Sequence, residues 1–256
     1  MGLFDKKFCD VCGDKIGLLG NRKLEDGNLC KNCAAKLSPW FDERRHSTVD
    51  QIKAQLDYRE ANRGAVANFK TTRVLGKTTR VMLDEDAGKF MVTKGGKITE
   101  ENPDVIDIAD VLGCNVDVHE NRTEEMREVK DKDGSTKRVS YNPPLYRYSY
   151  DFYVEIMVNN PYFDQMRFKL NNSSISVGSA RGGMQTDPKL ASPEYQECYN
   201  IANEIKQVLG EAHDAVRENA AQAAAPKTAV VCPLCGATTI PDANGRCEYC
   251  GGAVAG

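Results

Sequence analysis

Four Cys-x-x-Cys pairs constrain the fold of this 256-residue chain more than any other feature of its sequence. Two pairs lie near each end of the chain: Cys9 with Cys12, Cys30 with Cys33, Cys232 with Cys235, and Cys247 with Cys250. Two thiolates separated by two residues reach one ion from a single tight turn, and four thiolates suit tetrahedral Zn²⁺. The sequence therefore predicts two structural zinc ions, each closed by four sulfur ligands.

Other uses of these cysteines fit the pattern less well. Disulfides are typical of secreted domains, and the first residues show no apolar signal segment. A thioredoxin-like redox pair needs a surrounding βαβ unit, which none of the pairs has. An iron–sulfur cluster stays open as an alternative. Zinc is favoured because Gly13, Gly236 and Gly251 follow three of the pairs and allow the positive φ that a zinc-binding turn often needs.

The two cysteine-rich ends differ in the elements expected to carry the ligands. In residues 1–40, glycines punctuate short apolar segments, and a segment rich in Ala and Leu follows the second pair. A turn, a hairpin and a short helix make a treble-clef-like zinc module. Residues 230–256 contain no helical segment and predict a compact zinc ribbon. The two unpaired cysteines, Cys114 and Cys198, are expected to be small buried residues.

Between these modules the sequence predicts one larger domain with connecting segments. Residues 41–68 predict a linking helix, capped by Ser47 or Thr48, with Ile52 and Leu56 on its apolar face. Residues 69–214 predict antiparallel strands closed by an amphipathic helix. The Ala-rich residues 215–229 predict a flexible linker.

The clearest strand runs from Tyr146 to Val158, with aromatic or branched residues at every second position. Such a stripe could be a stacking platform for nucleic acid, but no Lys or Arg interrupts it, so core packing is favoured. Residues 121–140 are almost all polar and carry both charge signs. A solvated hairpin turning at Asp133-Gly134 is the main interpretation, and a charged contact arm is the alternative.

The predicted elements resemble a known architecture and a known family. Six or seven antiparallel strands followed by one helix resemble a pleckstrin-homology-like barrel, which implies an α+β fold with the helix capping the barrel. The segment CDVCGDKIGLLGNRKLEDGNLCKNCAAKLSP, the later REAN and LDEDAGKF resemble a bacterial domain-of-unknown-function family, in which a four-cysteine zinc module precedes a pleckstrin-homology-like region. The resemblance covers about residues 1–212 and is specific in the first 37. It implies zinc ligands at the first four cysteines and a cytoplasmic bacterial setting, and it implies no activity.

The function expected from these features is that of a non-catalytic scaffold or adaptor that engages a protein partner, through the barrel and the N-terminal module. We expect no catalytic and no cofactor-binding residues, because His46, His119 and His213 lie in different segments and no nucleotide-binding or hydrolase motif occurs. No apolar run is long enough to span a membrane, and a cytoplasmic location is expected.

Two alternatives remain, nucleic-acid binding through the zinc modules and lipid binding by the barrel. The chain has 34 Lys and Arg against 37 Asp and Glu and a pI of about 5.8. Each four-thiolate zinc site adds about two negative charges, so the loaded protein carries about −7. Nucleic-acid binders usually show a basic face, and only a local patch of Lys15, Arg22, Lys23 and Lys31 keeps that alternative open.

Overall fold

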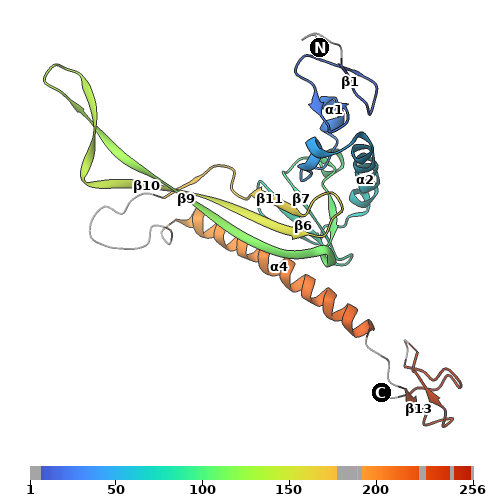
Figure 1. Ribbon diagram of the computed structural model, residues 1–256. Helices are drawn as coiled ribbons and strands as arrows, with labels where there is room; N and C mark the ends of the chain where they lie inside the picture. The colour runs from blue at the N-terminus through green and yellow to red at the C-terminus, as the bar shows by residue number, and fades with distance from the viewer. Residues whose placement is uncertain (1–6, 178–188, 190–191, 225–228, 243–244, 255–256) are drawn as a thin grey trace. The chain divides into compact units, whose positions relative to one another are not determined.

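The computed structural model describes residues 7–177, 189, 192–224, 229–242 and 245–254. The chain divides into two compact units, Met1–His213 and Asp214–Gly256. Figure 1 shows the first unit as a small N-terminal module, helix α2, antiparallel strands and the first part of helix α4. No helix of the described residues combines the length and the apolar character needed to cross a membrane.

The N-terminal module has the element order that its sequence predicts. Its elements are β1 (Lys7–Phe8), β2 (Lys15–Ile16), β3 (Arg22–Lys23), β4 (Asn28–Leu29), α1 (Lys31–Ala34) and the 3-10 helix η1 (Glu43–His46). β1 pairs with β2, and β3 with β4, both antiparallel. The core holds few apolar side chains besides three cysteines: Ile16, Leu24, Leu29, Leu37 and Ile52. A core this small normally needs a metal or disulfides to stay folded.

Helix α2 (Val49–Asn68) begins with a capping box in which Thr48 and Gln51 each accept the other's backbone N–H. Thr48 is therefore the N-cap. The predicted apolar face is only partly correct, because Leu56 is half-buried. The buried residues of α2 are Ile52, Gln55, Arg59, Asn62 and Val66. They share a spacing of three and four residues, as expected for one helix face, but three of the five are polar.

Two antiparallel sheets follow α2. The first has the order β5-β6-β7-β8, and the second places β9 on one side of β10 and both β11 and β12 on the other. The strands are β5 (Arg73–Leu75), β6 (Arg80–Asp84), β7 (Lys89–Thr93), β8 (Val105–Asp107), β9 (Val111–Lys130), β10 (Thr136–Val158), β11 (Gln165–Lys169) and β12 (Ile175–Val177). Two short helices, α3 (Ile98–Glu101) and the 3-10 helix η2 (Ile108–Asp110), lie between them.

One hydrophobic core joins both sheets and helix α4 (Pro193–Ala224). Alternate residues of β10 from Tyr150 to Val158 are buried in it, so the aromatic stripe serves core packing, as predicted. Helix α4 adds Tyr195, Ala202, Ile205 and Leu209 to the same core. The edge of the Tyr195 ring meets Tyr150 and Phe152 at centroid distances of 4.9 and 5.0 Å.

The predicted closed barrel is wrong. Among the described residues no backbone pairing joins the two sheets, and each keeps its own edge strands. Helix η2 separates β8 from β9, and β9 pairs only with β10. The unit is instead an α+β arrangement in which two antiparallel sheets and a helix share one core.

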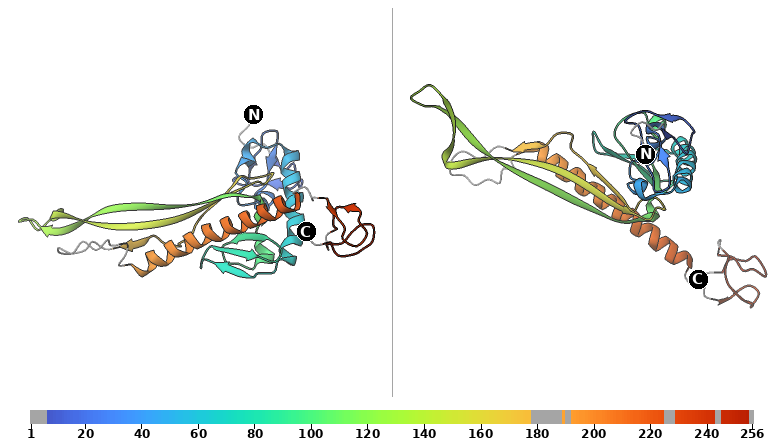
Figure 2. Two further views of the ribbon diagram at one scale, coloured as in Figure 1. Left: turned by 90° about the horizontal axis from the view of Figure 1, so that it is seen from below. Right: turned by 45° about the horizontal axis from the view of Figure 1, so that its top comes forward.

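The polar residues 121–140 form the predicted hairpin. β9 and β10 stay paired from the core outward to Lys130 and Thr136, and the turn closes with a bond from the N–H of Gly134 to the carbonyl of Asp131. Figures 1 and 2 show the β9–β10 hairpin extending well beyond the end of helix α4 that lies beside it. Its role as a contact arm stays a prediction.

The C-terminal unit departs from the predicted linker. Helix α4 continues to Ala224, so residues 215–224 are helical rather than irregular, and 225–228 lie outside the described residues. The ribbon that follows has strands β13 (Val230–Val231) and β14 (Thr238–Thr239), which pair with each other, and a bridge between Arg246 and Ala253.

Candidate metal centres

The first cysteine pair lies in a tight turn between β1 and β2. The N–H of Gly13 donates to the carbonyl of Cys9 over 2.8 Å, and the N–H of Cys9 donates to the carbonyl of Asp14 over 2.9 Å. Gly13 has a φ of 77°, a conformation that favours glycine. This turn orients the Sγ atoms of Cys9 and Cys12 toward one point.

The second pair lies at the start of α1. Cys30 is the N-cap of this helix, and its Sγ accepts the N–H of Cys33 over 3.3 Å. The N–H of Cys30 in turn donates to the Sγ of Cys9 over 3.3 Å. The four Sγ atoms lie within 4.8 Å of one another, and those of Cys12 and Cys30 are 3.7 Å apart.

The C-terminal ribbon uses the same turn twice. Gly236 and Gly251 have φ values of 72° and 68°, and each donates its N–H to the carbonyl of the first cysteine of its pair over 2.8 Å. The four Sγ atoms again lie within 4.8 Å of one another. The Sγ separations are 3.6 Å for Cys232 and Cys250, and 3.7 Å for Cys235 and Cys247.

These separations fit a tetrahedral metal site. Sulfurs about 2.3 Å from a zinc ion at tetrahedral angles stand about 3.8 Å apart, whereas disulfide sulfurs stand about 2.05 Å apart. Thiolates are the ligating form. Although burial opposes it, backbone N–H bonds lower the pKa of Cys9 to about 7, and they lower that of Cys247 to about 6. Both sites are compatible with a metal ion such as zinc.

The structure thus brings together the eight cysteines that the sequence pairs, four at each end, and the positive φ expected at the three glycines is confirmed. Cys114 and Cys198 lie apart, partly buried against the main core. Burial raises the pKa of Cys114 to about 11 and raises that of Cys198. His119 lies beside Asp117, and within the described ranges no histidine joins a metal-binding group.

A buried polar network beside the first site was missed by the sequence analysis. The guanidinium of Arg59 donates to the carboxylate of Asp104 over 2.6 Å and also to the carbonyls of Lys36 and Asn102. The hydroxyl of Ser38 donates to the other oxygen of Asp104 over 2.8 Å. Burial raises the pKa of Asp104, and Arg59 and Ser38 oppose that shift.

Asn62, one turn along α2, completes the network. Its side-chain amide donates to Pro103 over 2.8 Å and accepts the N–H of Val105 over 2.9 Å. Residues 36–38 belong to the N-terminal module and 102–105 lead into β8, so α2 fastens the module to the first sheet. Arg59 and Asn62 are the first and last residues of REAN, and because both are polar, apolar periodicity along α2 does not predict that they are buried.

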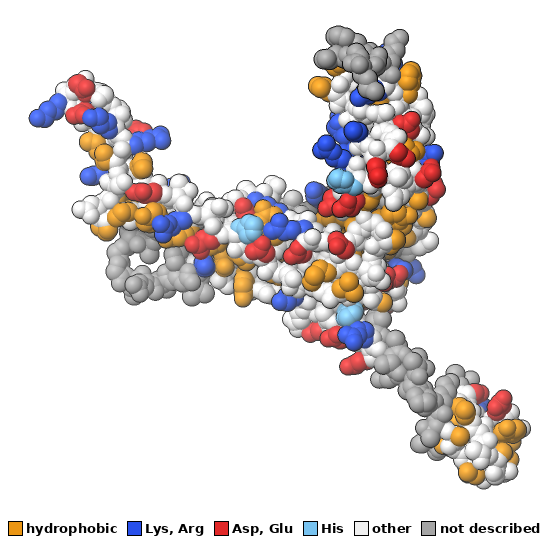
Figure 3. Space-filling model, in the orientation of Figure 1, with side chains coloured by type: hydrophobic (Ala, Val, Ile, Leu, Met, Phe, Trp, Pro, Cys, Tyr) orange, Lys and Arg blue, Asp and Glu red, His pale blue; other side chains and the backbone are white. Residues whose placement is uncertain are grey.

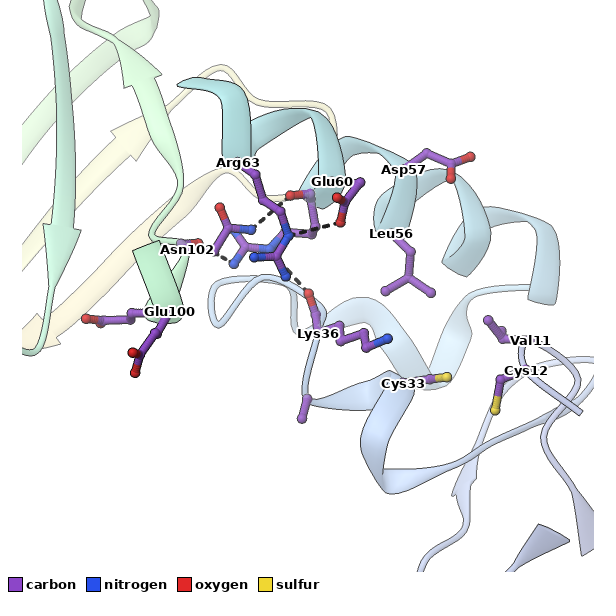
Figure 4. A pocket seen from close by; sticks show the side chains of 13 residues that line it. Val11, Cys12, Cys33, Lys36, Leu56, Asp57, Glu60, Arg63, Glu100 and Asn102 are labelled. Atoms are coloured by element: carbon purple, nitrogen blue, oxygen red, sulfur yellow. Dashed lines mark hydrogen bonds and ion pairs between the residues drawn. The ribbon is translucent and has the colours of Figure 1, made fainter. Parts of the chain in front are cut away.

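An open cavity of about 330 Å³ lies between the first site and α2. Figure 4 shows Cys12, Cys33 and Lys36 on one side of it and the α2 side chains on the other. Of its charged groups on α2, Arg63 pairs with Glu60 over 3.0 Å, Arg59 pairs with Asp104 over 2.6 Å, and Asp57 is exposed. It therefore supplies no unpaired buried group to which a reaction could be assigned.

Residues 7–55 match a family model described as a domain of unknown function, DUF4428. This segment contains the first four cysteines and ends within α2, before Arg59. Comparison with curated proteins and with solved structures finds no match.

Proposed function

We propose that this protein is a non-catalytic adaptor whose C-terminal zinc ribbon binds a protein partner. The observation that carries the proposal is the surface of the ribbon, which exposes most of its large apolar side chains. The described apolar core of the ribbon is Cys232, Cys247 and Val254, with Val230 partly buried against it. Its exposed large hydrophobic residues are Val231, Leu234, Ile240 and Tyr249.

Zinc has a structural role in this proposal. Four thiolates fill a tetrahedral coordination shell, which leaves no position for a substrate or an activated water. A ribbon with so small a core depends on its metal for folding, because ligand binding supplies the free energy that burial does not. The metal therefore allows apolar side chains to remain on the surface.

Two of the exposed residues lie at the tips of the two metal-binding turns. Leu234 is 72% exposed and Tyr249 is 70% exposed. Both turns supply cysteines to the same group of four sulfurs. Contiguous exposed apolar side chains mark interaction sites, and tyrosine is enriched at the centre of protein interfaces. Figure 3 shows hydrophobic side chains on the visible face of the ribbon.

The charge of the ribbon favours a protein over nucleic acid or a membrane. Residues 229–254 contain one cation, Arg246, and two anions, Asp242 and Glu248. The thiolate site adds about two further negative charges. A surface of this kind repels phosphate groups, whereas an apolar protein surface needs no positive charge to bind it.

The first unit supports the adaptor role through its fold. Four antiparallel strands, a second antiparallel sheet and a closing helix follow the order of a pleckstrin-homology-like domain, and we infer that relationship without the closed barrel. The absence of enzymatic activity, the bacterial origin and the cytoplasmic location belong to the same proposal. They rest on the sequence resemblance and on thiolate sites that require reducing conditions.

The proposal is tested with full-length protein in two steps. Crosslinked complexes are first purified from the native host with the wild type, with Leu234→Ser combined with Tyr249→Ser, and with a control that combines Val74→Ser and Leu112→Ser. The control removes two exposed apolar side chains of the first unit. The recovered partner is then purified, and its dissociation constant for each variant is measured.

The ribbon variant is expected to lose at least about tenfold in affinity, as truncated interface hot spots do, while the control stays within about twofold. Metal content is measured in all three proteins to show that both sites remain filled. Equal affinity of the ribbon variant and the wild type would refute the assigned surface. Recovery of nucleic acid alone, released by about 0.5 M salt, would refute the adaptor role.

A further inference from the structure

The N-terminal module presents two adjacent leucines to solvent. Leu18 is 91% exposed and Leu19 is 88% exposed, the two highest values among the exposed large hydrophobic residues of the described chain. They occupy the turn between β2 and β3, closed by a bond of 3.0 Å from the N–H of Gly20 to the carbonyl of Gly17. Ile16, two residues before Leu18, is buried, so one end of this turn is anchored in the module while both leucine side chains are exposed.

Basic side chains lie directly beside this leucine tip. The guanidinium of Arg22 donates to the carbonyl of Leu19 over 3.3 Å. Arg44, on η1, donates to the carbonyl of Lys23 over 3.0 Å. Burial, and then the neighbouring charges of Arg22 and Arg45, lower the pKa of Arg44.

Arg22, Lys23, Arg44 and Arg45 together form the basic group of the module. Within the part of the chain that the structure describes, none of the four forms an ion pair at 4.0 Å or less. Figure 3 shows Lys and Arg side chains gathered on one side of the module, with acidic side chains below them on that side and others across the module. The module is near neutral as a whole, and its basic group adjoins the leucine tip through Arg22.

We propose that the leucine tip and the basic group form a docking site for an anionic lipid surface. The leucines enter the boundary between headgroups and acyl chains, where apolar side chains of surface-bound segments are buried. The four cations then face the lipid phosphates and carboxylates, which attract basic side chains near an anionic surface. Neither contribution alone holds a protein on a membrane, because stable attachment needs two signals.

The two features together distinguish a bilayer from other anionic partners. Nucleic acid pairs with the four cations but offers no apolar layer into which two protruding leucines can insert. A protein groove could accept the leucines, but it would have to be strongly acidic around its rim. A bilayer containing anionic lipid supplies an apolar layer beneath a negative surface. This inference concerns the first unit and is independent of the protein contact proposed for the ribbon.

The test is vesicle co-sedimentation of the full-length protein. One set of vesicles contains phosphatidylcholine with about 30% phosphatidylserine, and the other contains phosphatidylcholine alone, both at about 0.1 M salt. The variants are Leu18→Ser combined with Leu19→Ser, Lys23→Gln combined with Arg45→Gln, and Leu112→Ser as a matched apolar control. All four substituted surface positions of the module are exposed, and Leu112 is an exposed residue of β9.

The wild-type protein is expected to bind the anionic vesicles, and its affinity for the neutral vesicles is expected to be at least about tenfold lower. The leucine variant is expected to lose at least about tenfold and the charge variant about tenfold or more. The control stays within about twofold of the wild type. Retention of both metal ions in each variant shows that loss of binding is not loss of folding.

A second measurement reports insertion directly. In a Trp40→Phe background, Leu19→Trp places a single fluorophore at the tip, and its emission shifts to shorter wavelength and is quenched by brominated acyl chains. Unchanged binding by the leucine variant, or an unquenched tryptophan on bound protein, would overturn the proposal. The proposal would also be overturned if duplex DNA displaced the protein from the vesicles and the vesicle-bound tryptophan showed no quenching. That outcome would assign the cations to nucleic acid.

Discussion

The buried pair of Arg59 and Asp104 gives the sharpest test of how the zinc module is held to the rest of the first unit. The side chains are 7% and 0% exposed, and the charged atoms are 2.6 Å apart. Asp104→Ala removes the anion and leaves the guanidinium buried with only carbonyl acceptors. Breaking a buried pair from one side costs about 3–5 kcal/mol, because the remaining charge has lost its compensation.

The same reasoning predicts a different result when both charges are removed. Arg59→Met combined with Asp104→Ala leaves no uncompensated charge, although the hydroxyl of Ser38 and two carbonyls lose a partner. The double variant is therefore expected to be more stable than either single variant, with a coupling energy of at least about 2 kcal/mol. Since a small domain is stable by only about 5–15 kcal/mol, each single change should be clear in an unfolding curve.

The assay is urea unfolding with zinc in excess, followed by the fluorescence of Trp40, the only tryptophan of the chain. Trp40 lies two residues after Ser38, donates its backbone N–H to that side chain over 3.1 Å, and stands 6.3 Å from the Phe168 ring. It therefore reports on the network and on its attachment to the second sheet.

Glu60→Ala is the matched control on the same helix. Glu60 and Arg63 form an exposed pair at 3.0 Å, and such pairs contribute about 0–1 kcal/mol. The reasoning would be refuted if Asp104→Ala cost no more than Glu60→Ala. It would also be refuted if the two network substitutions were simply additive.

Three further predictions concern the metal, two glycines of positive φ and the side chain of Asn171. Elemental analysis of protein purified without added metal is expected to give two zinc ions per chain, and about one for Cys30→Ser; iron in place of zinc would contradict the assignment. Gly76→Ala should lower the free energy of unfolding by about 2–3 kcal/mol, because φ is 93° and a Cβ atom would lie 2.3 Å from the carbonyl of Thr79. Gly88 also has a positive φ, but its Cβ would meet open space, so Gly88→Ala should lower the free energy of unfolding by only about 1 kcal/mol. If urea unfolding gave equal losses for Gly76→Ala and Gly88→Ala, the clash with Thr79 would not be the cause. Asn171→Ala should cost about 1–3 kcal/mol by calorimetry, because its side chain accepts the N–H of Phe152 and donates to the carbonyls of Tyr150 and Ser173; an unchanged melting temperature would contradict this.

Local chemistry in the sequence predicted the parts of the structure that depend on local geometry. The metal-binding turns follow from cysteine spacing and a glycine of positive φ, and the β10 stripe follows from alternation over many residues. The β9–β10 turn follows from Asp133-Gly134. Each of these signals is complete within a short segment, so no knowledge of distant residues is needed.

The features that the sequence did not predict depend on contacts between residues far apart in the chain. Whether two sheets close into a barrel depends on pairing between strands far apart in sequence, which no local pattern specifies. The sequence-based prediction ends α4 too early, because it assigns the Ala-rich residues 215–224 to a linker although alanine has the highest helix propensity. The α2 network was missed because a buried face made of Gln55, Arg59 and Asn62 resembles an exposed face until their partners at 102–105 are known.

The two cysteine-rich modules show how one metal chemistry can support different partners. Three of their four cysteine pairs form the same turn, with the same bond from the glycine N–H to the first cysteine. Both modules expose apolar residues in turns, Leu18 and Leu19 in one and Leu234 and Tyr249 in the other. The difference is charge, because four unpaired cations adjoin the first pair and the ribbon has a single arginine. In the two proposals the metal supplies the folding free energy of both modules, so their surfaces are free to differ, and surface charge favours a lipid surface for one module and a protein for the other.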